Sequence, residues 1–377
     1  MATARKTGLA LGAAMVLTMG CGSSTTTDSG VAPGFDAGVI DGGGSPGADA
    51  GPFDAALPDG SAPGTDAGEI DGGGPSLDAG GGVADPGEAT GATVTTTSHS
   101  LSRPSTTIPL TIYLPADPSP APVIVFHHGF QLSPDDYASY GEHLASWGYV
   151  VVMPQMPGGL IGGPNHRELG EHLGAILDWV AAGGDEIAGR VDATRIALAG
   201  HSLGGKISLL RASSDSRVRA VFGVDPVDSG AGPLGGSAAD YPSVTPELMG
   251  SITVPIVLLG ETTNGSCTGF GCMPCAPADQ NFHQYFTNAA SPALEIDVQG
   301  ANHMSFLDDP ACGFTCSVCS AGSDDTAVTR RLTRRSMTAF FQVILRGDDR
   351  YRTYLTGDAM AADVSAGLVT TATRNGF

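Results

Sequence analysis

The sequence predicts an α/β protein built on a mostly parallel, twisted sheet with helices on both faces. Short continuous apolar runs, which are typical of buried parallel strands, recur between residues 123 and 298. Segments with apolar residues at helical spacing lie between these runs. Strands and helices that alternate in this way form a parallel sheet, and ligands of such sheets bind at the carboxyl ends of the strands.

The expected elements follow in chain order. Segments 93–99 and 106–113 alternate polar and apolar residues, with many β-branched ones, as antiparallel edge strands do. Buried strands are expected at 123–126, 149–153, 195–199, 218–224, 252–259 and 294–298. The clearest helix carries its apolar residues on one face, at Leu169, Leu173, Ile176, Leu177 and Val180. Further helices are expected at 135–147, 206–211 and 326–345, the last of which closes the domain.

Residues 1–20 are expected to be an export signal. They combine a basic start with a short apolar run that is too short to span a bilayer. The Gly20-Cys21 pair resembles the lipobox of bacterial lipoproteins, in which the cysteine is lipidated, although Thr18 stands where those proteins usually have Leu. We expect an exported protein that is anchored to the cell envelope through a lipid on Cys21, with ordinary secretion as the alternative.

Residues 21–90 are expected to be a disordered tether. Between Gly22 and Thr90 there are 19 glycines, twelve acidic residues and no Lys or Arg. This stretch has too few large apolar side chains to offset the entropy of ordering it. Two near-repeats begin at Asp36 and Asp66 and suggest calcium binding as an alternative, but their spacing does not match the nonapeptide pattern. One folded domain is expected at 91–357, followed by a C-terminal tail at 358–377.

Charge and hydropathy exclude two classes of partner. The formal net charge is −21, and no basic stripe is present to bind the phosphates of a nucleic acid. No apolar run reaches 18 residues, so a transmembrane helix is not expected. The sequence implies no obligate protein partner.

The pentapeptide Gly200-His-Ser202-Leu-Gly204 matches the Gly-x-Ser-x-Gly pattern of a nucleophile elbow. A second match, around Ser45, lies in the tether with no strand before it and no helix after it. Ser202 instead lies between an expected strand and an expected helix. The two glycines permit the sharp turn that holds such a serine in a strained backbone conformation. We therefore predict that Ser202 is a nucleophile.

A serine hydroxyl needs a general base, which a carboxylate orients in turn. In this kind of fold the chain order is serine, acid, histidine. Only His283 and His303 follow Ser202, and we favour His303 because it comes directly after the last expected strand. His283 lies in a more helical stretch.

Two acids compete for the third position. Asp225 and Glu261 each follow an expected strand that ends at the same edge of the sheet, and position alone does not choose between them. Asp228, three residues beyond its strand, is a weaker candidate.

The oxyanion of the intermediate needs two backbone N–H donors. We predict Leu203, which follows the nucleophile, and Phe130, which follows Gly129 in the loop after an early strand. The adjacent His127 and His128 raise metal ligation as an alternative, but no helical partner or carboxylate accompanies them, so no metal site is expected.

Several blocks of the sequence resemble chlorophyllase and its bacterial relatives in the α/β-hydrolase superfamily. They are Pro122-Val-Ile-Val-Phe-His-His-Gly-Phe, His143-Leu-Ala-Ser-Trp-Gly-Tyr-Val-Val-Val-Met-Pro-Gln155, Ala199-Gly-His-Ser-Leu-Gly-Gly-Lys206, Gly223-Val-Asp-Pro-Val-Asp228, Cys275-Ala-Pro and Asn302-His-Met-Ser-Phe-Leu-Asp-Asp309. The resemblance covers residues 110–347 and implies that 91–357 is an α/β-hydrolase catalytic domain.

The spacing of serine, acid and histidine is also similar to that of platelet-activating-factor acetylhydrolases, and the chain is broadly similar to polyester and cutinase-like esterases. In the acetylhydrolases the acid follows the strand directly after the elbow helix, which implies Asp225 rather than Glu261. One departure from chlorophyllases is Leu203, where they typically carry Arg. The resemblance therefore supports ester hydrolysis more firmly than chlorophyll as the substrate.

Six cysteines lie in two clusters on either side of His303: Cys267, Cys272, Cys275, Cys312, Cys316 and Cys319. Two pairs have the C-x-x-C spacing of zinc sites, but an even number in an exported chain favours disulfides. We expect three bridges that pin the loops beside the site and so position His303. The sequence does not choose their connectivity.

Together these observations predict a serine carboxylic-ester hydrolase that uses Ser202, His303 and Asp225, forms an acyl-enzyme and needs no cofactor. Phe130 and Met304 are candidates for lining an apolar substrate pocket. An acyltransferase that uses the same intermediate, or a non-catalytic surface-binding lipoprotein on a hydrolase scaffold, are the alternatives.

Overall fold

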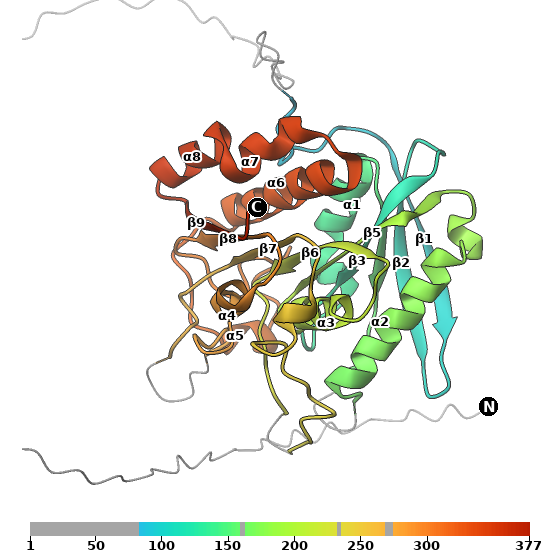
Figure 1. Ribbon diagram of the computed structural model, residues 1–377, viewed down its shortest axis with the longest axis horizontal. Helices are drawn as coiled ribbons and strands as arrows, with labels where there is room; N and C mark the ends of the chain where they lie inside the picture. The colour runs from blue at the N-terminus through green and yellow to red at the C-terminus, as the bar shows by residue number, and fades with distance from the viewer. Residues whose placement is uncertain (1–82, 159–162, 232–234, 268–273) are drawn as a thin grey trace, which may run out of the picture. The chain divides into compact units, whose positions relative to one another are not determined.

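The strands among the described residues form one nine-stranded sheet. The structure is a computed structural model that describes residues 83–158, 163–231, 235–267 and 274–377 (Figure 1). The strands are β1 Val94–Ser102, β2 Thr107–Pro115, β3 Ala121–His127, β4 Val150–Pro154, β5 Val191–His201, β6 Val218–Val224, β7 Ile256–Gly260, β8 Ala293–Val298 and β9 Val369–Arg374.

The strand order is β1-β2-β4-β3-β5-β6-β7-β8-β9. The six strands from β4 to β8 pair in parallel, β1 and β2 are antiparallel at one edge, and β9 is antiparallel at the other. This arrangement confirms the predicted α/β fold and its mostly parallel sheet. The carboxyl ends of β3, β5, β6, β7 and β8 therefore meet at one edge of the sheet.

Eight helices are present among the described residues. They are α1 Ala138–Ser146, α2 His166–Ala181, α3 Leu203–Ala212, α4 Phe282–Asn288, α5 Phe314–Ser317, α6 Thr326–Arg346, α7 Thr353–Thr356 and α8 Asp358–Ser365. Short 3₁₀ turns, η1 to η4, cover Pro134–Tyr137, Asp185–Ile187, Met249–Ser251 and Asp349–Arg352. All four predicted helices exist. Helix α2 is capped by Asn165, whose side chain accepts a hydrogen bond from the Glu168 N–H.

A hydrophobic core lies on each face of the sheet. Alternate residues of one strand point to opposite faces, so Phe126 of β3 packs in one core and Val125 in the other. The first core includes Phe340 of α6 and residues of α1, whereas the second includes Leu173 of α2 and residues of α3. Figure 1 shows α6, α7 and α8 gathered on one side of the sheet and α2, α3 and α4 on the other.

The fold begins earlier than residue 91. The export signal, Cys21 and most of the predicted tether lie outside the described residues, but Val83 to Thr90 are described and pack on the domain. Asp85 and Glu88 form ion pairs with Arg331 of α6. These pairs anchor a stretch whose composition alone predicts disorder, because the sequence does not reveal the basic partner on α6.

The structure also differs from the expected C-terminal tail. Residues 358–377 contain α8 and β9, and β9 pairs along the whole length of β8, from Val298↔Val369 to Ala293↔Arg374. The sequence of β9 is mostly polar, and four of its six residues are exposed, so apolar patterning does not reveal the strand. Its backbone nevertheless satisfies the hydrogen-bonding groups of the β8 edge.

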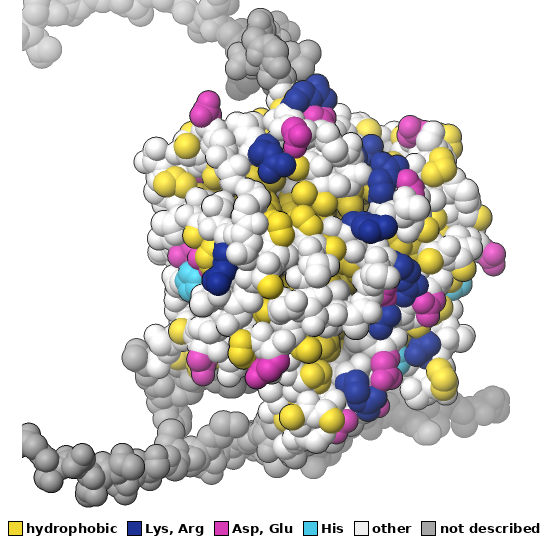
Figure 2. All heavy atoms as spheres, viewed as in Figure 1, with side chains coloured by type: hydrophobic (Ala, Val, Ile, Leu, Met, Phe, Trp, Pro, Cys, Tyr) yellow, Lys and Arg dark blue, Asp and Glu magenta, His cyan; other side chains and the backbone are white. Residues whose placement is uncertain are grey.

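None of the helices among the described residues is long and apolar enough to cross a bilayer. On the face in Figure 2, Lys and Arg side chains have acidic side chains among them rather than forming a continuous basic stripe.

Candidate active site

Ser202 occupies a sharp turn between β5 and α3. Its backbone has φ 54° and ψ −121°, a conformation that residues other than glycine rarely adopt. A Cβ atom on Gly200 would lie 2.5 Å from the Gly204 carbonyl carbon, and one on Gly204 would lie 2.1 Å from the His127 carbonyl oxygen. The glycines of the motif are therefore required by close backbone contacts, which also hold the loop after β3 against the turn.

Three loops bring Ser202, His303 and Asp225 into one hydrogen-bonded chain. His303 Nε2 lies 2.8 Å from Ser202 Oγ, and His303 Nδ1 lies 2.6 Å from Asp225 Oδ2. The side chains of His303 and Asp225 are 3% and 0% exposed, so water does not compete for their hydrogen bond. The geometry suits an Nδ1–H that donates to Asp225 and an Nε2 that accepts the serine proton.

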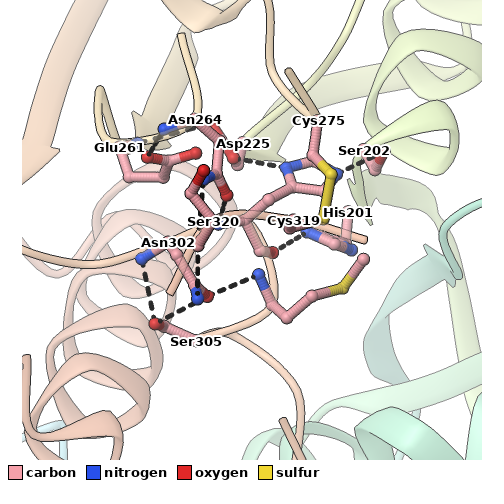
Figure 3. Close-up of polar contacts among 12 residues, drawn as sticks. His201, Ser202, Asp225, Glu261, Asn264, Cys275, Asn302, Ser305, Cys319 and Ser320 are labelled. Carbon is pink, nitrogen blue, oxygen red and sulfur yellow. Dashed lines mark hydrogen bonds and ion pairs between the residues drawn. A yellow bond between two sulfur atoms is a disulfide. The ribbon is translucent and has the colours of Figure 1, made fainter. Parts of the chain in front are cut away.

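The second acid, Glu261, lies beside Asp225 and does not contact His303 through its carboxyl group. Its backbone N–H donates to Asp225 Oδ1 over 3.3 Å, and its Oε2 accepts the Asn264 N–H over 2.8 Å (Figure 3). Burial, reinforced by the negative charge of Asp225, raises the Glu261 pKa to about 9. Glu261 is therefore a neutral carboxylic acid at neutral pH, which does not suit it to stabilise an imidazolium.

The other weighed candidates are engaged elsewhere. Asp228 forms a buried ion pair with Lys206 of α3, with Nζ 2.9 Å from Oδ1. His283 lies on α4, and its Nδ1 pairs with Glu295 of β8 over 2.6 Å. The histidine that contacts Ser202 is His303.

The predicted oxyanion donors come from two segments that touch. Leu203 is the first residue of α3, and the N–H at that position has no acceptor within the helix. The loop of Phe130 packs against the elbow, because a Cβ on Gly204 would meet both the His127 and His128 carbonyl oxygens. An N–H at the start of a helix also lies where the helix dipole favours negative charge.

The two predicted pocket residues have different surroundings. Phe130 is 48% exposed, and Met304, next to His303 in sequence, is 7% exposed. The Phe130 ring is therefore exposed on the loop that packs against the elbow, whereas Met304 belongs to the apolar core on one face of the sheet.

His201, Asp225 and His303 have side-chain atoms close enough together to suggest a metal centre. The ring nitrogens of both histidines are engaged in hydrogen bonds. His303 binds Ser202 and Asp225, and His201 binds the Tyr137 hydroxyl and the His303 carbonyl oxygen. The Nδ1 atoms of the adjacent His127 and His128 also bind backbone carbonyl oxygens. The donor set therefore fits hydrogen bonding rather than metal ligation.

Disulfides link the loops beside the site. Cys275, after β7, is bonded to Cys319, after β8, and Cys312 is bonded to Cys316. Cys275, Cys316 and Cys319 are thus held in disulfides, and Cys316 and Cys319, which have C-x-x-C spacing, belong to different bridges. Cys267 is disulfide-bonded, and Cys272 lies outside the described residues.

The structure adds residues that sequence reasoning missed. Asn264 Oδ1 accepts the His303 N–H over 2.9 Å, while its Nδ2 donates to the Ser320 carbonyl oxygen. Asn302 Nδ2 donates to the same carbonyl oxygen (Figure 3). Both asparagines fix the loop that carries His303. No sequence signal identifies Asn264, because its partner lies 39 residues further along the chain.

Comparisons with known proteins agree with this fold. The family model of chlorophyllase matches residues 81–369. Chlorophyllase-2 of Arabidopsis thaliana is 27% identical over 270 residues, covering 67% of this chain and 83% of that protein. Chlorophyllase type 0 of Chenopodium album is 26% identical over 264 residues, covering 64% and 73%.

A solved structure, the ferulic acid esterase from Streptomyces cinnamoneus, superposes with a TM-score of 0.52 at 22% identity. It covers 69% of this chain and 92% of the esterase chain. This likeness bears on the fold, which is that of the α/β-hydrolases.

Proposed function

The chain belongs to the chlorophyllase family and is a carboxylic ester hydrolase, and from that premise we propose that it works as a serine esterase through an acyl-enzyme on Ser202. The observation that carries the proposal is the continuous chain Ser202–His303–Asp225 at the carboxyl ends of β5, β6 and β8. Asp225 holds the imidazole in the tautomer whose Nε2 accepts a proton, and it stabilises the imidazolium that forms.

In the first half of the reaction, Ser202 Oγ attacks the ester carbonyl carbon while its proton moves to His303 Nε2. The carbonyl oxygen becomes an oxyanion, which the N–H groups of Leu203 and Phe130 bind. In a serine protease with the same kind of oxyanion hole, losing one donor lowers kcat about 10²- to 10³-fold. The intermediate then expels the alcohol oxygen, which takes the proton from His303.

In the second half, His303 takes a proton from water as the water oxygen attacks the acyl carbon. The second tetrahedral intermediate collapses, and the proton on His303 returns to Ser202 Oγ as the carboxylic acid leaves. Water supplies the oxygen of the acid, so the cycle is balanced without any cofactor.

We propose an apolar ester as the substrate. The support is the half-exposed Phe130 ring, which lies on the loop of the proposed oxyanion donor. A panel of p-nitrophenyl esters of increasing acyl length, a polyester film and a chlorophyll ester distinguishes the candidates. Activity that rises with acyl length supports the proposal, and a preference for the shortest acetyl ester contradicts it.

We also propose that the protein is exported, with Cys21 as its lipid anchor. The support is the basic and apolar start of the sequence together with the disulfides, which persist in oxidising compartments. Radiolabelled fatty acid should enter the wild-type chain in a bacterial host and not Cys21→Ser; equal labelling of both contradicts the anchor.

A fluorophosphonate probe tests the nucleophile. The wild type should be labelled and should hydrolyse a p-nitrophenyl ester, whereas Ser202→Ala should do neither. Ser119→Ala, an exposed serine in the β2–β3 loop, is the matched control and should be labelled normally. Labelling that survives in Ser202→Ala overturns the assignment.

A further inference from the structure

A second chain of buried polar groups lies behind the proposed triad. The Gly129 N–H donates to the Tyr137 hydroxyl oxygen over 3.3 Å, and that oxygen lies 2.7 Å from His201 Nδ1. His201 Nε2 lies 2.9 Å from the His303 carbonyl oxygen. The side chains of Tyr137 and His201 are fully buried, so water cannot replace these contacts.

Only one arrangement of protons satisfies this chain. The Gly129 N–H can only donate, so the Tyr137 oxygen accepts from it and its own O–H is left to donate to His201 Nδ1. His201 Nδ1 is then unprotonated, and its single proton is on Nε2. The His303 carbonyl oxygen can only accept, so it receives that proton.

The environment of His201 keeps it in this neutral form. Burial, assisted by the neighbouring His303, holds the pKa of His201 well below the ordinary value of 6.5. The two rings also pack against each other, with centroids 4.6 Å apart. An imidazolium at His201 would lose the acceptor that the Tyr137 hydroxyl requires.

The two ends of this chain of hydrogen bonds lie next to two groups of the proposed reaction, an oxyanion donor and the general base. Gly129 directly precedes Phe130, whose N–H is the proposed oxyanion donor, and His303 is the proposed base. His201 directly precedes Ser202, so the chain passes beside the nucleophile. It crosses segments that are 64 and 102 residues apart in sequence.

We propose that Tyr137 and His201 are positioning residues that fix the oxyanion loop relative to the catalytic histidine. The proposal rests on the proposed serine-esterase function. Neither side chain touches the substrate; each acts through a backbone group, the N–H of Gly129 or the carbonyl of His303. Because the oxyanion and the imidazolium exist only after attack, loss of this chain should weaken the transition state more than the bound substrate.

Tyr137→Phe tests the proposal while keeping the aromatic ring in the core. We expect kcat for a p-nitrophenyl ester to fall about 10- to 100-fold, less than complete loss of an oxyanion donor, with KM changed less than threefold. A boronic acid that forms a tetrahedral adduct on serine should lose affinity by the same factor as kcat/KM.

Tyr140→Phe is the matched control. Tyr140 is also buried and packs on Phe126, as Tyr137 does, but its hydroxyl donates to the Phe306 carbonyl oxygen and takes no part in the chain. Tyr137→Phe loses two buried hydrogen bonds, those to the Gly129 N–H and to His201 Nδ1, whereas Tyr140→Phe loses the one to the Phe306 carbonyl oxygen. The melting temperature should therefore fall in both variants, and more in Tyr137→Phe. An equal loss of kcat in the two variants, or a rise in KM alone in Tyr137→Phe, overturns the proposal.

A measurement without catalysis separates this inference from the proposed function. In the Ser202→Ala chain labelled with ¹⁵N-histidine, one of the nine histidines should have an unprotonated, hydrogen-bonded Nδ1 that shifts in Tyr137→Phe and not in Tyr140→Phe. The absence of such a histidine overturns the positioning role. If the wild type is not labelled by fluorophosphonate, the proposed function fails, and the spectrum still reports whether the Tyr137–His201 bond exists.

Discussion

At the residue scale, two members of the proposed triad have unusual backbone conformations. Ser202 has φ 54° and Asp225 has φ 41°. Conformations of this kind cost about 1–3 kcal/mol each and persist only where neighbours fix them. The Ser202 N–H donates to the Val224 carbonyl oxygen over 3.0 Å, and the Asp225 N–H donates to the Leu259 carbonyl oxygen over 2.6 Å. The adjoining parallel strands thus hold both residues in place.

Exchanging the two neighbouring acids for amides should give very different losses of activity. Asp225→Asn presents an amide to His303 Nδ1 and favours the wrong tautomer, so kcat should fall about 10⁴-fold. Glu261→Gln should lower kcat less than tenfold, because its carboxyl contacts the Asn264 N–H and not the imidazole. Steady-state kinetics of the two variants test this expectation. A larger loss of kcat in Glu261→Gln would mean that Asp225 is not the acid of the triad.

Glu261 should also make stability depend on pH. Its pKa is raised from 4.5 to about 9 by burial and by the charge of Asp225, so the folded state binds a proton that the unfolded state releases. The neutral carboxyl therefore stabilises the fold fully below pH 4.5, and this contribution is lost as the pH rises toward 9.

Urea unfolding of the wild type and Glu261→Gln between pH 5 and 8.5 tests this expectation. One proton corresponds to at most about 1.4 kcal/mol per pH unit, and the amide removes that slope. The free energy of unfolding of Glu261→Gln should therefore rise relative to that of the wild type as the pH increases. A difference that does not change with pH contradicts the neutral acid.

Sequence reasoning at this scale found residues that belong to short motifs. Ser202 and His303 follow from the elbow pattern and the order of the chain, but position left Asp225 and Glu261 open until the family resemblance was used. The deciding fact is which carboxyl group points at Nδ1, and this depends on side-chain direction. Tyr137 and Asn264 lie beyond such reasoning because they contact partners distant in sequence.

At the element scale, a buried ion pair ties the elbow helix α3 to the loop after β6. Lys206 Nζ lies 2.9 Å from Asp228 Oδ1 and donates to the Ser229 carbonyl oxygen over 2.6 Å. The Asp228 carboxylate also accepts the N–H groups of Val244 and Thr245. The pair therefore fixes the spacing between Ser202, at the start of α3, and the loop that begins with Asp225.

Lys206→Met should destabilise the fold by about 3–5 kcal/mol, because it leaves the Asp228 charge buried without its partner. Arg167→Met, which breaks exposed pairs with Glu171 and Asp240, is the control and should cost less than about 1 kcal/mol. Chemical denaturation measures both. If the two variants lose the same free energy of unfolding, the buried pair contributes no more to stability than an exposed one.

The elements were predictable where apolar patterning is strong. Strand β6 matches its predicted range of 218–224, and α6 begins at its predicted first residue, Thr326. Strand β7 begins at Ile256 rather than 252, because the stretch 252–255 only leads out of the 3₁₀ turn η3, which ends at Ser251, and includes Pro255, which has no N–H to donate. Hydrophobicity identifies a buried segment but does not mark where its backbone becomes extended.

At the scale of the whole molecule, β9 should protect the sheet from aggregation. It covers the outer edge of β8, whose side chains are mostly buried and apolar. A chain that ends at Ala366 keeps α8 but exposes this edge, so it should aggregate and unfold at a lower temperature. Light scattering and calorimetry of the truncated chain test this, and a monomer with the wild-type melting temperature would show that β9 is dispensable.

The Cys275–Cys319 bridge should matter more than Cys312–Cys316 for both stability and activity. It closes a separation of 44 residues against only 4, which corresponds to about 4 and about 2 kcal/mol of loop-closure free energy. It also joins the loops after β7 and β8 next to Ser320, whose carbonyl oxygen binds Asn264 and Asn302. Because Asn264 in turn binds the His303 N–H, loss of the longer bridge should loosen the base.

The double variants Cys275→Ser/Cys319→Ser and Cys312→Ser/Cys316→Ser separate these effects without leaving a single thiol of a broken pair. The first should lower both the melting temperature and kcat, and the second should lower the melting temperature less and leave kcat within about threefold of the wild type. Since the loss in the first arises from a displaced histidine, fluorophosphonate labelling of Ser202 should slow in parallel with kcat. If the short bridge proves the more important for kcat, the path from Cys319 through Ser320 and Asn264 to His303 does not position the base.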